Sequence, residues 1–146
     1  VLLAGWCGYC RGQALYLQAM HELLQNDGID INVVVINKAN AASPNYQSAL
    51  IYVLDEENQI QKDENGDPIF RCQFPLFQDT EETNAWELHN GKKDDFYIYD
   101  GDGVLRIYLP KSNSTQVPTN LSTEEGFENV MQAILDVYHG ERPSNQ

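Results

Sequence analysis

Residues 1–12 read VLLAGWCGYCRG and place Cys7 and Cys10 directly after a short apolar run. The letters VLLA predict a buried strand that ends in a turn at Gly5. From Cys7 to about residue 25, apolar side chains recur at helical spacing, and Gly28 is a typical left-handed residue at a helix end. The cysteine pair is therefore expected in the first turn of a helix that follows a strand.

The spacing of Cys7 and Cys10 suits thiol chemistry. Residues three positions apart on a helix lie on neighbouring turns of one face, so the two sulfurs can meet. At the helix N-terminus, unpaired N–H groups and the macrodipole favour the attacking thiolate form of Cys7, and Arg11 adds positive potential. Cys10 lies one turn further in and is suited to resolve a mixed disulfide. We predict a redox-active Cys7–Cys10 disulfide as the working group, with no cofactor and no metal.

The remaining residues around the pair are predicted to face a substrate or to tune Cys7. Trp6 precedes the pair, and an aromatic side chain there is expected to pack beside the sulfurs more readily than to read a substrate. Gly8 and Tyr9 stand between the cysteines. Tyr9 is expected to be partly exposed and to tune Cys7 without reacting itself.

Two other roles for the pair are weaker. A structural staple between Cys7 and Cys10 would close a very short loop and restrict the unfolded chain little. A zinc site usually needs four ligands, and only Cys72 and three scattered histidines remain, at no zinc spacing. Cys72 stands beside an expected strand and is predicted to be a small core residue, with a second resolving thiol as the alternative.

The first half of the chain predicts a βαβ unit. Residues 29–37, IDINVVVIN, form a β-branched run typical of a strand covered on both faces, so the two strands should be parallel. A second helix is expected from Ser43, with Pro44 in its first turn, to about residue 54. Residues 55–67, DEENQIQKDENGD, are acidic and predict a solvated loop inserted into the domain.

The second half predicts a strand, a hairpin and helices. A strand is expected at 74–78 and a short helix at 83–88. The DGDG of residues 100–103 lies between two alternating runs and indicates an antiparallel hairpin. A polar loop at 111–120 leads to a final amphipathic helix with a capping box of Ser122 and Glu125. Its expected inward positions are Phe127, Val130, Ile134, Leu135 and Val137.

These elements together predict one α/β domain over residues 1–146. A βαβ half joined to a ββα half gives a mixed central β-sheet flanked by helices on both faces, which is the thioredoxin fold. A cysteine pair that opens the first helix after the first strand is where a redox motif of that fold should lie.

Charge and hydropathy limit the partners. The net charge of −13 argues against nucleic acid and against anionic lipid, because both are recognised through clustered Lys and Arg. No apolar run approaches the ~20 residues that a membrane-spanning helix needs. The predicted partners are therefore protein or small-molecule disulfides and thiols.

The chain resembles the N-terminal domain of the selenoprotein P family over nearly its whole length. The resemblance is carried by LLAGWCGYC, by VVVIN, by the long stretch FPLFQDTEETNAWELHNGKKDDFYIYDGDGVLRIYL and by the final helix. Cys7 takes the position of that family's selenocysteine, and Cys10 the position of its cysteine. The resemblance implies a thioredoxin fold with redox activity that can extend to peroxides. It also implies an oxidising, extracytoplasmic compartment, secreted or periplasmic.

Two departures from the thioredoxin pattern concern proton and substrate handling. Thioredoxins carry a cis-proline just before the first hairpin strand, and that position is Lys93 or a neighbour here. Lys93 is therefore predicted to face the substrate, and either Lys92 or Lys93 to reach the thiolate. Thioredoxin also has a buried acid six residues before its first cysteine, and Val1 stands there in this chain. Proton transfer at Cys10 must therefore use another base or water.

The sequence favours a thiol–disulfide oxidoreductase. One alternative is a thiol peroxidase in which Cys7 passes through a sulfenic acid. Another is a redox-inert module that uses the thioredoxin fold to bind a partner.

Overall fold

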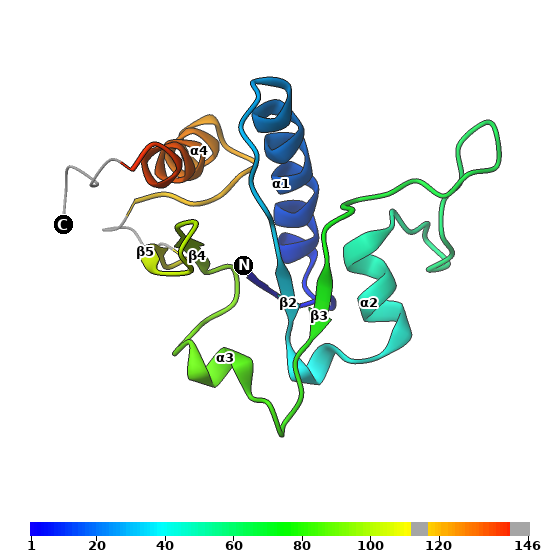
Figure 1. The fold of residues 1–146 in the computed structure, drawn as a ribbon. Coiled ribbons are helices and arrows are strands. Elements are labelled where there is room, and N and C mark those ends of the chain that lie inside the picture. Colours follow the sequence, from blue (N-terminus) through cyan, green and yellow to red (C-terminus); the bar gives the residue numbers. More distant parts are fainter. Residues whose placement is uncertain (112–116, 141–146) are drawn as a thin grey trace.

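A computed structural model describes residues 1–111 and 117–140 of the chain. Figure 1 shows helices and strands that alternate along it, as expected for an α/β protein. In chain order the elements are β1 (Leu2–Leu3), α1 (Gly8–Asn26), β2 (Val35–Asn37), the 3-10 turn η1 (Ala39–Ala41), α2 (Pro44–Ile51), β3 (Leu76–Gln78), α3 (Ala85–Leu88), β4 (Phe96–Tyr99), β5 (Leu105–Leu109) and α4 (Glu124–Tyr138). In the part of the chain described, no helix combines the length and apolar character needed to cross a membrane.

Strands β1, β2 and β3 form a parallel sheet in that order, which confirms the parallel pairing expected of the first two strands. Leu2 pairs with Ile36, and Val35 pairs with Leu76. The expected strand at 29–37 is assigned as strand only over Val35–Asn37. Its first residues run beyond the ends of both short neighbours, so they find no ladder partner among the residues described.

Strands β4 and β5 form the expected antiparallel hairpin. In its turn the Asp100 Oδ1 atom accepts the backbone N–H groups of Asp102 at 3.0 Å and Val104 at 2.9 Å. The hairpin is a separate two-stranded sheet. The prediction of one continuous mixed sheet is therefore wrong. The two sheets are joined through Leu2, whose N–H donates to Asp95 O (3.1 Å) and whose carbonyl accepts from Asp94 N (2.8 Å).

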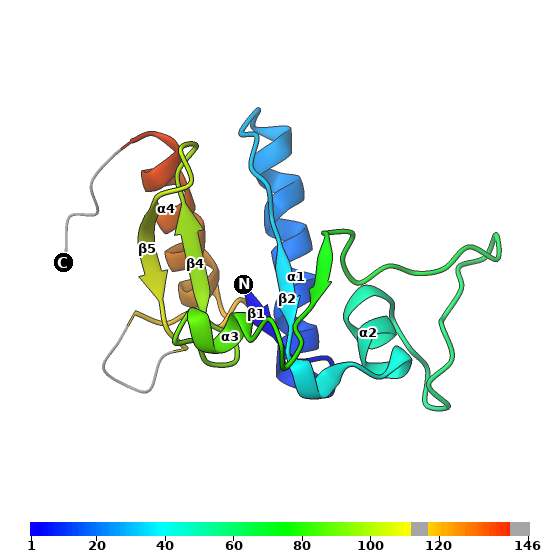
Figure 2. The same cartoon turned by 60° about the horizontal axis from the view of Figure 1, so that its bottom comes forward.

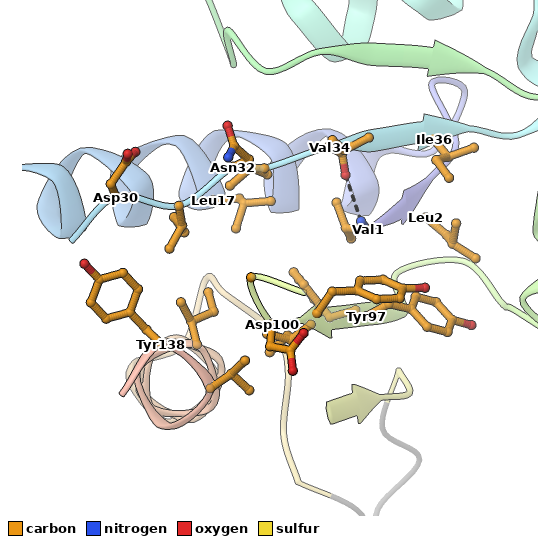
Figure 3. A pocket seen from close by; sticks show the side chains of 18 of the residues that line it. Val1, Leu2, Leu17, Asp30, Asn32, Val34, Ile36, Tyr97, Asp100 and Tyr138 are labelled. Carbon is orange, nitrogen blue, oxygen red and sulfur yellow. Dashed lines mark hydrogen bonds between the residues drawn. The ribbon is translucent and has the colours of Figure 1, made fainter. Parts of the chain in front are cut away.

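A cavity of about 650 Å³ lies at the seam between the two sheets. In Figure 3 Val34 and Ile36 lie on one side of this cavity and Tyr97 on the other. The Val1 ammonium group also lines it and donates a hydrogen bond to Val34 O at 2.8 Å (Figure 3). No cysteine lines this cavity, so it is separate from the place where the thiol chemistry is expected.

Helix α1 lies along the parallel sheet, and α4 packs against both strands of the hairpin (Figure 2). The observed α1 agrees with the expected helix from residue 7 to about 25. The apolar side chains on its inner face are at most 3% exposed: Cys10, Ala14, Leu17, Met20 and Leu24. These side chains join the apolar residues of β1 and β2 in the main core.

Helix α4 begins one residue later than its predicted cap. Thr123, not Ser122, is the N-cap, and its Oγ1 accepts the N–H of Gly126 at 3.2 Å. Ser122 is engaged elsewhere, because its hydroxyl donates to Asn120 Oδ1 at 2.8 Å. The five predicted inward positions all pack: Val130 and Val137 are buried, and Phe127, Ile134 and Leu135 are partly buried against the core.

Residues 52–70 form an arm between α2 and β3 that extends away from the other elements (Figure 1). The prediction of a solvated segment at 55–67 is confirmed, since every residue there is exposed. The arm is nevertheless paired locally, because Asp55 and Asp63 each accept two backbone N–H groups with one carboxylate oxygen. Isolated bridges join Tyr52 to Phe70, Leu54 to Ile60 and Lys62 to Pro68. Part of the expected polar loop, residues 112–116, lies outside the described residues.

Candidate active site

Cys7 and Cys10 lie where the spacing predicted. Cys7 is the N-cap of α1, and its sulfur accepts the N–H of Cys10 at 3.4 Å. Cys7 is 7% exposed and Cys10 is 0% exposed, so only the first sulfur is open to an attacking or attacked partner. Both cysteines are free thiols in this structure.

The environment of Cys7 stabilises its thiolate. Burial of the sulfur acts to raise the pKa of Cys7, but the backbone and side chain of Cys10 and the Lys93 ammonium group donate hydrogen bonds that hold it below the ordinary value. In return, the hydrogen bond to Cys7 raises the pKa of Lys93. Cys7 is therefore the group better able to act as a nucleophile at neutral pH.

Lys93 supplies the cation that was also expected from Arg11. The Lys93 Nζ atom lies 5.3 Å from the centroid of the Trp6 ring, and its ammonium group lowers the pKa of Cys7. A guanidinium nitrogen of Arg11 would lie 3.8 Å from a Cβ added to Gly8. The expected effect of Arg11 on Cys7 stays a prediction.

Trp6, Gly8 and Tyr9 adjoin the cysteines in the chain. Trp6 is 40% exposed, and its Nε1 donates to Asn40 Oδ1 at 3.1 Å, which restrains the ring. Gly8 is exposed and Tyr9 is half-buried. The Tyr9 ring lies under the Lys111 ammonium group, with 4.3 Å between Nζ and the ring centroid.

Asp94 is the site residue that the sequence reasoning missed. It is 0% exposed, and one of its carboxylate oxygens lies within 4.8 Å of the sulfurs of both Cys7 and Cys10. Burial first, and then the hydrogen bond and negative charge of Asp94, raise the pKa of Cys10 well above that of an ordinary thiol. The two cysteines are therefore shifted in opposite directions. A sequence signal existed in the acidic pair Asp94–Asp95 directly before a strand, but nothing in the local pattern connects it with the cysteines.

Asp95 anchors the loop that carries Lys93 and Asp94. Its side chain is buried and accepts hydrogen bonds from Lys92 N at 2.7 Å, Lys111 N at 2.8 Å and the Tyr108 hydroxyl at 2.8 Å. These bonds join the loop before β4 to the residues at the end of β5. The positions of Lys93 and Asp94 against the cysteine pair follow from that anchor.

Cys7, Cys10 and Asp94 each offer an atom of a type that can bind a metal ion. Two ammonium groups oppose such a use, because Lys93 bonds to Cys7 and Lys111 Nζ lies 3.4 Å from Asp94 Oδ2. The histidines that the sequence left as further candidates are not in this group. The positive charges around the cluster disfavour a bound cation. They favour proton exchange between the two sulfurs and the carboxylate.

Cys72 is a core residue, as predicted. Its side chain is 1% exposed and belongs to the main core, and its sulfur donates to Leu50 O at 3.2 Å. Burial raises the pKa of the Cys72 thiol. A buried, hydrogen-bonded thiol of this kind is poorly suited to act as a second resolving group.

Comparison with known proteins agrees with this geometry. No curated protein and no solved structure shows significant similarity to the chain. The family model described as selenoprotein P, N terminal region, matches residues 1–143, which is nearly the whole chain. The resemblance expected from the cysteine motif and the hairpin is thereby confirmed, and the chain belongs to the selenoprotein P N-terminal region family.

Proposed function

We propose that this protein is a thiol–disulfide oxidoreductase of thioredoxin fold, with Cys7 as the nucleophile and Cys10 as the resolving thiol. The observation that carries the proposal is the placement of the two thiols: Cys7 caps α1 and is 7% exposed, with its sulfur 3.4 Å from Cys10 N, and Cys10 is fully buried. In agreement with this placement, the pKa of Cys7 is lowered and that of Cys10 is raised. Two neighbouring titratable groups whose environments push their pKa values apart are typical of an acid–base pair with divided roles. Membership of the selenoprotein P N-terminal family supports the same conclusion.

The arrangement of the strands supports the fold assignment. The parallel strands follow the order β1, β2, β3, and the free side of β1 bonds to the chain just before β4 through Leu2. The hairpin and the helix packed on it continue from there. A βαβ unit beside a ββα unit, with a cysteine pair opening the first helix, is the arrangement expected of a thioredoxin-like protein.

The chemistry follows from the two environments. The Cys7 thiolate attacks one sulfur of a partner disulfide, a mixed disulfide forms, and the other partner sulfur leaves as a thiolate with the bonding electrons. Cys10 then attacks the Cys7 sulfur, the Cys7–partner bond breaks, and the second partner sulfur leaves. The partner is reduced by two electrons, and Cys7 and Cys10 become a disulfide. The same steps in reverse donate a disulfide.

The exposed groups around Cys7 support protein or small-molecule disulfides as substrates. Trp6, Gly8 and Tyr9 flank the only sulfur of the pair that is open, and Lys93 adds a positive charge there. The acidic net charge of −13 remains an argument against nucleic acid or anionic membrane as the partner. We further propose an oxidising, extracytoplasmic compartment, secreted or periplasmic, on the family resemblance.

A redox titration tests the proposal. The protein is equilibrated in glutathione buffers between about −150 and −300 mV, free thiols are alkylated, and the state of each cysteine is read by peptide mass. We expect one two-electron transition that joins Cys7 and Cys10, is lost in Cys7→Ser and in Cys10→Ser, and persists in the matched variant Cys72→Ala. A pair that never changes state over this range overturns the proposal and favours the redox-inert binding module.

Peroxide reduction is a second candidate because the stabilised Cys7 thiolate has a resolving thiol beside it. In that reaction Cys7 takes one oxygen from hydrogen peroxide and releases water, and Cys10 then displaces a second water to close the disulfide. Mixing reduced protein with hydrogen peroxide and following Cys7 by mass separates the two candidates. Fast oxidation of Cys7 supports the peroxidase, whereas slow oxidation with fast disulfide exchange supports the oxidoreductase.

A further inference from the structure

We propose that Asp94 is the proton acceptor of Cys10 during resolution of the mixed disulfide, and that Lys111 keeps Asp94 ionised between turnovers. The inference rests on the proposed function, since it concerns the second step of that reaction. In thioredoxin a buried acid six residues before the first cysteine accepts this proton. Val1 stands at that position here and cannot accept a proton with its side chain.

Cys10 needs an acceptor inside the protein. Its side chain is 0% exposed, so bulk water does not reach the sulfur directly. Burial and the neighbouring carboxylate keep it as a thiol at neutral pH, yet only the thiolate attacks a disulfide. Some group next to the sulfur must therefore take the proton as the attack proceeds.

Asp94 has the free atom that this role requires. Its Oδ1 is buried and has no hydrogen-bond partner among the residues described, although unpaired buried polar atoms are rare in folded proteins. The Cys10 sulfur lies within 4.8 Å of one oxygen of this carboxylate. Burial also raises the pKa of Asp94, which makes its carboxylate a better base than an exposed one.

The backbone around Asp94 is built to present this side chain to Cys10. Asp94 has φ of +70°, in the left-handed region that non-glycine residues seldom adopt. Its N–H donates to Leu2 O at 2.8 Å, which ties the residue to the strand that leads into the cysteine motif. An unusual conformation held by such a bond directs the carboxylate inward.

Lys111 compensates the buried charge of Asp94. Its Nζ lies 3.4 Å from Asp94 Oδ2, and its side chain is 38% exposed, so it links the carboxylate to the solvent side. The other charged or titratable groups that interact with Asp94 or belong to its cluster are Cys7, Tyr9 and Cys10 from α1 and Lys93 from its own loop. Asp95 is occupied by Lys92 N, Lys111 N and Tyr108 and does not compete for the proton.

The step balances with the groups present. Cys10 passes its proton to the Asp94 carboxylate and forms a bond to the Cys7 sulfur, and the partner sulfur leaves as a thiolate with the electron pair. Asp94 then releases the proton to water on the Lys111 side. The Lys111 ammonium group favours this release because it stabilises the ionised carboxylate. In the reverse direction Asp94 gives the proton back to Cys10.

The test compares Asp94→Asn with Asp102→Asn, which removes the same charge from the exposed hairpin turn. A glutathione mixed disulfide is formed on Cys7, and release of glutathione is timed from pH 6 to 10. We expect Asp94→Asn to slow release at pH 7 by about 100-fold, the lower range for loss of a general base. The deficit should shrink toward pH 10, because hydroxide then replaces the missing carboxylate as the proton acceptor during the attack, and Asp102→Asn should match the wild type.

A second readout separates this role from a structural one. The Asp94 charge raises the pKa of Cys7, so alkylation of Cys7 by iodoacetamide at pH 6 should be faster in Asp94→Asn while release is slower. Equal slowing of both steps, or an unchanged release rate, overturns the inference. If wild-type protein exchanges with glutathione but the variant does so equally fast, only this inference fails. If the wild type does not exchange at all, the proposed function fails with it.

A variant of Lys111 keeps the test informative if Asp94→Asn does not fold. Lys111→Met removes the charge that holds Asp94 ionised, so the pH midpoint of glutathione release should move upward. A midpoint that stays at the wild-type value in a folded Lys111→Met protein also overturns the inference.

Discussion

The Lys93 ammonium group and the Cys7 sulfur act on one another across the site, and each changes the pKa of the other: that of Cys7 falls and that of Lys93 rises. Lys93 stands in the loop before β4, whereas Cys7 caps α1. The loop therefore acts on the nucleophile from outside the helix, in addition to the helix N–H groups.

Lys93→Met should make Cys7 a weaker nucleophile at neutral pH. Loss of a partly solvent-screened ion pair should slow alkylation of Cys7 at pH 7 by about twofold to fivefold. The rates should converge above the ordinary thiol pKa of about 8.5, where Cys7 is ionised in both proteins. Iodoacetamide kinetics across pH measure this, with the neighbouring exposed Lys92→Met as the control. Equal rates in Lys93→Met and wild type at pH 7 would show that Lys93 does not stabilise the thiolate.

Asp95→Ala should disturb the active site indirectly, through the loop that carries Lys93 and Asp94. The substitution leaves Lys92 N, Lys111 N and the Tyr108 hydroxyl without their acceptor, and loss of charge-assisted bonds at a buried carboxylate should cost about 2–4 kcal/mol of stability. Denaturant unfolding measures that cost. Alkylation of Cys7 should slow as in Lys93→Met, because the loop is no longer held against the cysteines.

Tyr108→Phe should weaken the same anchor less than Asp95→Ala does. It removes one of the three hydrogen bonds and should cost about 1 kcal/mol. Alkylation of Cys7 should stay at the wild-type rate, because two backbone anchors remain. Full loss of Cys7 reactivity in Tyr108→Phe would contradict the anchoring role assigned to Asp95.

The parts of the fold that were predicted correctly are those with local causes. The start of α1 at Cys7 follows from apolar spacing and a cap, and the hairpin turn follows from the Asp100 side chain and the glycines beside it. The Ser122 cap failed for a local reason too, since Asn120 competes for its side chain. Helix starts and tight turns are decided by a few neighbouring residues, which a sequence displays directly.

The parts that were not predicted depend on contacts between distant segments. Asp94 reaches Cys10 only because Asp95 bonds to Lys111 and Tyr108 and because Leu2 bonds to the same loop. The separation of the hairpin from the parallel sheet likewise depends on how far β1 can pair on each side. Neither relationship has a periodicity or a spacing that marks it in the chain.

Gly5 and Gly12 should respond oppositely to alanine. A Cβ on Gly5 would overlap the backbone carbonyl of Tyr46, so Gly5→Ala must move α2 or the turn before Cys7 and should cost about 1–3 kcal/mol. Gly12 lies within α1 with nothing within 4 Å of an added Cβ, so Gly12→Ala should stabilise the protein by up to about 1 kcal/mol. Denaturant unfolding measures the change in unfolding free energy for each variant. An unchanged value in Gly5→Ala would show that α2 does not pack tightly against the turn before Cys7.

The pH dependence of stability should distinguish the reduced from the oxidised protein. The pKa of Cys7 is lowered by folding, so Cys7 contributes stability that is present above the ordinary thiol pKa and is lost as pH falls through its folded value. The pKa of Cys10 is raised, so Cys10 contributes stability that is present below the ordinary value and is lost as pH rises toward its folded value. Both contributions disappear in the disulfide, whereas those of Cys72 and the tyrosines remain and cancel in the difference.

The unfolding free energy of the reduced form minus that of the oxidised form should therefore pass through a maximum near the ordinary thiol pKa of about 8.5. Below this pH the difference should fall as Cys7 becomes protonated in the folded protein, and above it the difference should fall because only the unfolded chain ionises Cys10. Denaturant unfolding of both forms from pH 6 to 10 measures the curve. Cys10→Ala cannot form the disulfide, so it is compared with the reduced wild type, and it should lack the part of the alkaline decline that Cys10 causes. A difference that rises steadily through pH 10 would show that Cys10 ionises as freely in the folded protein as in the unfolded chain, and the division of roles between the two thiols would then be wrong.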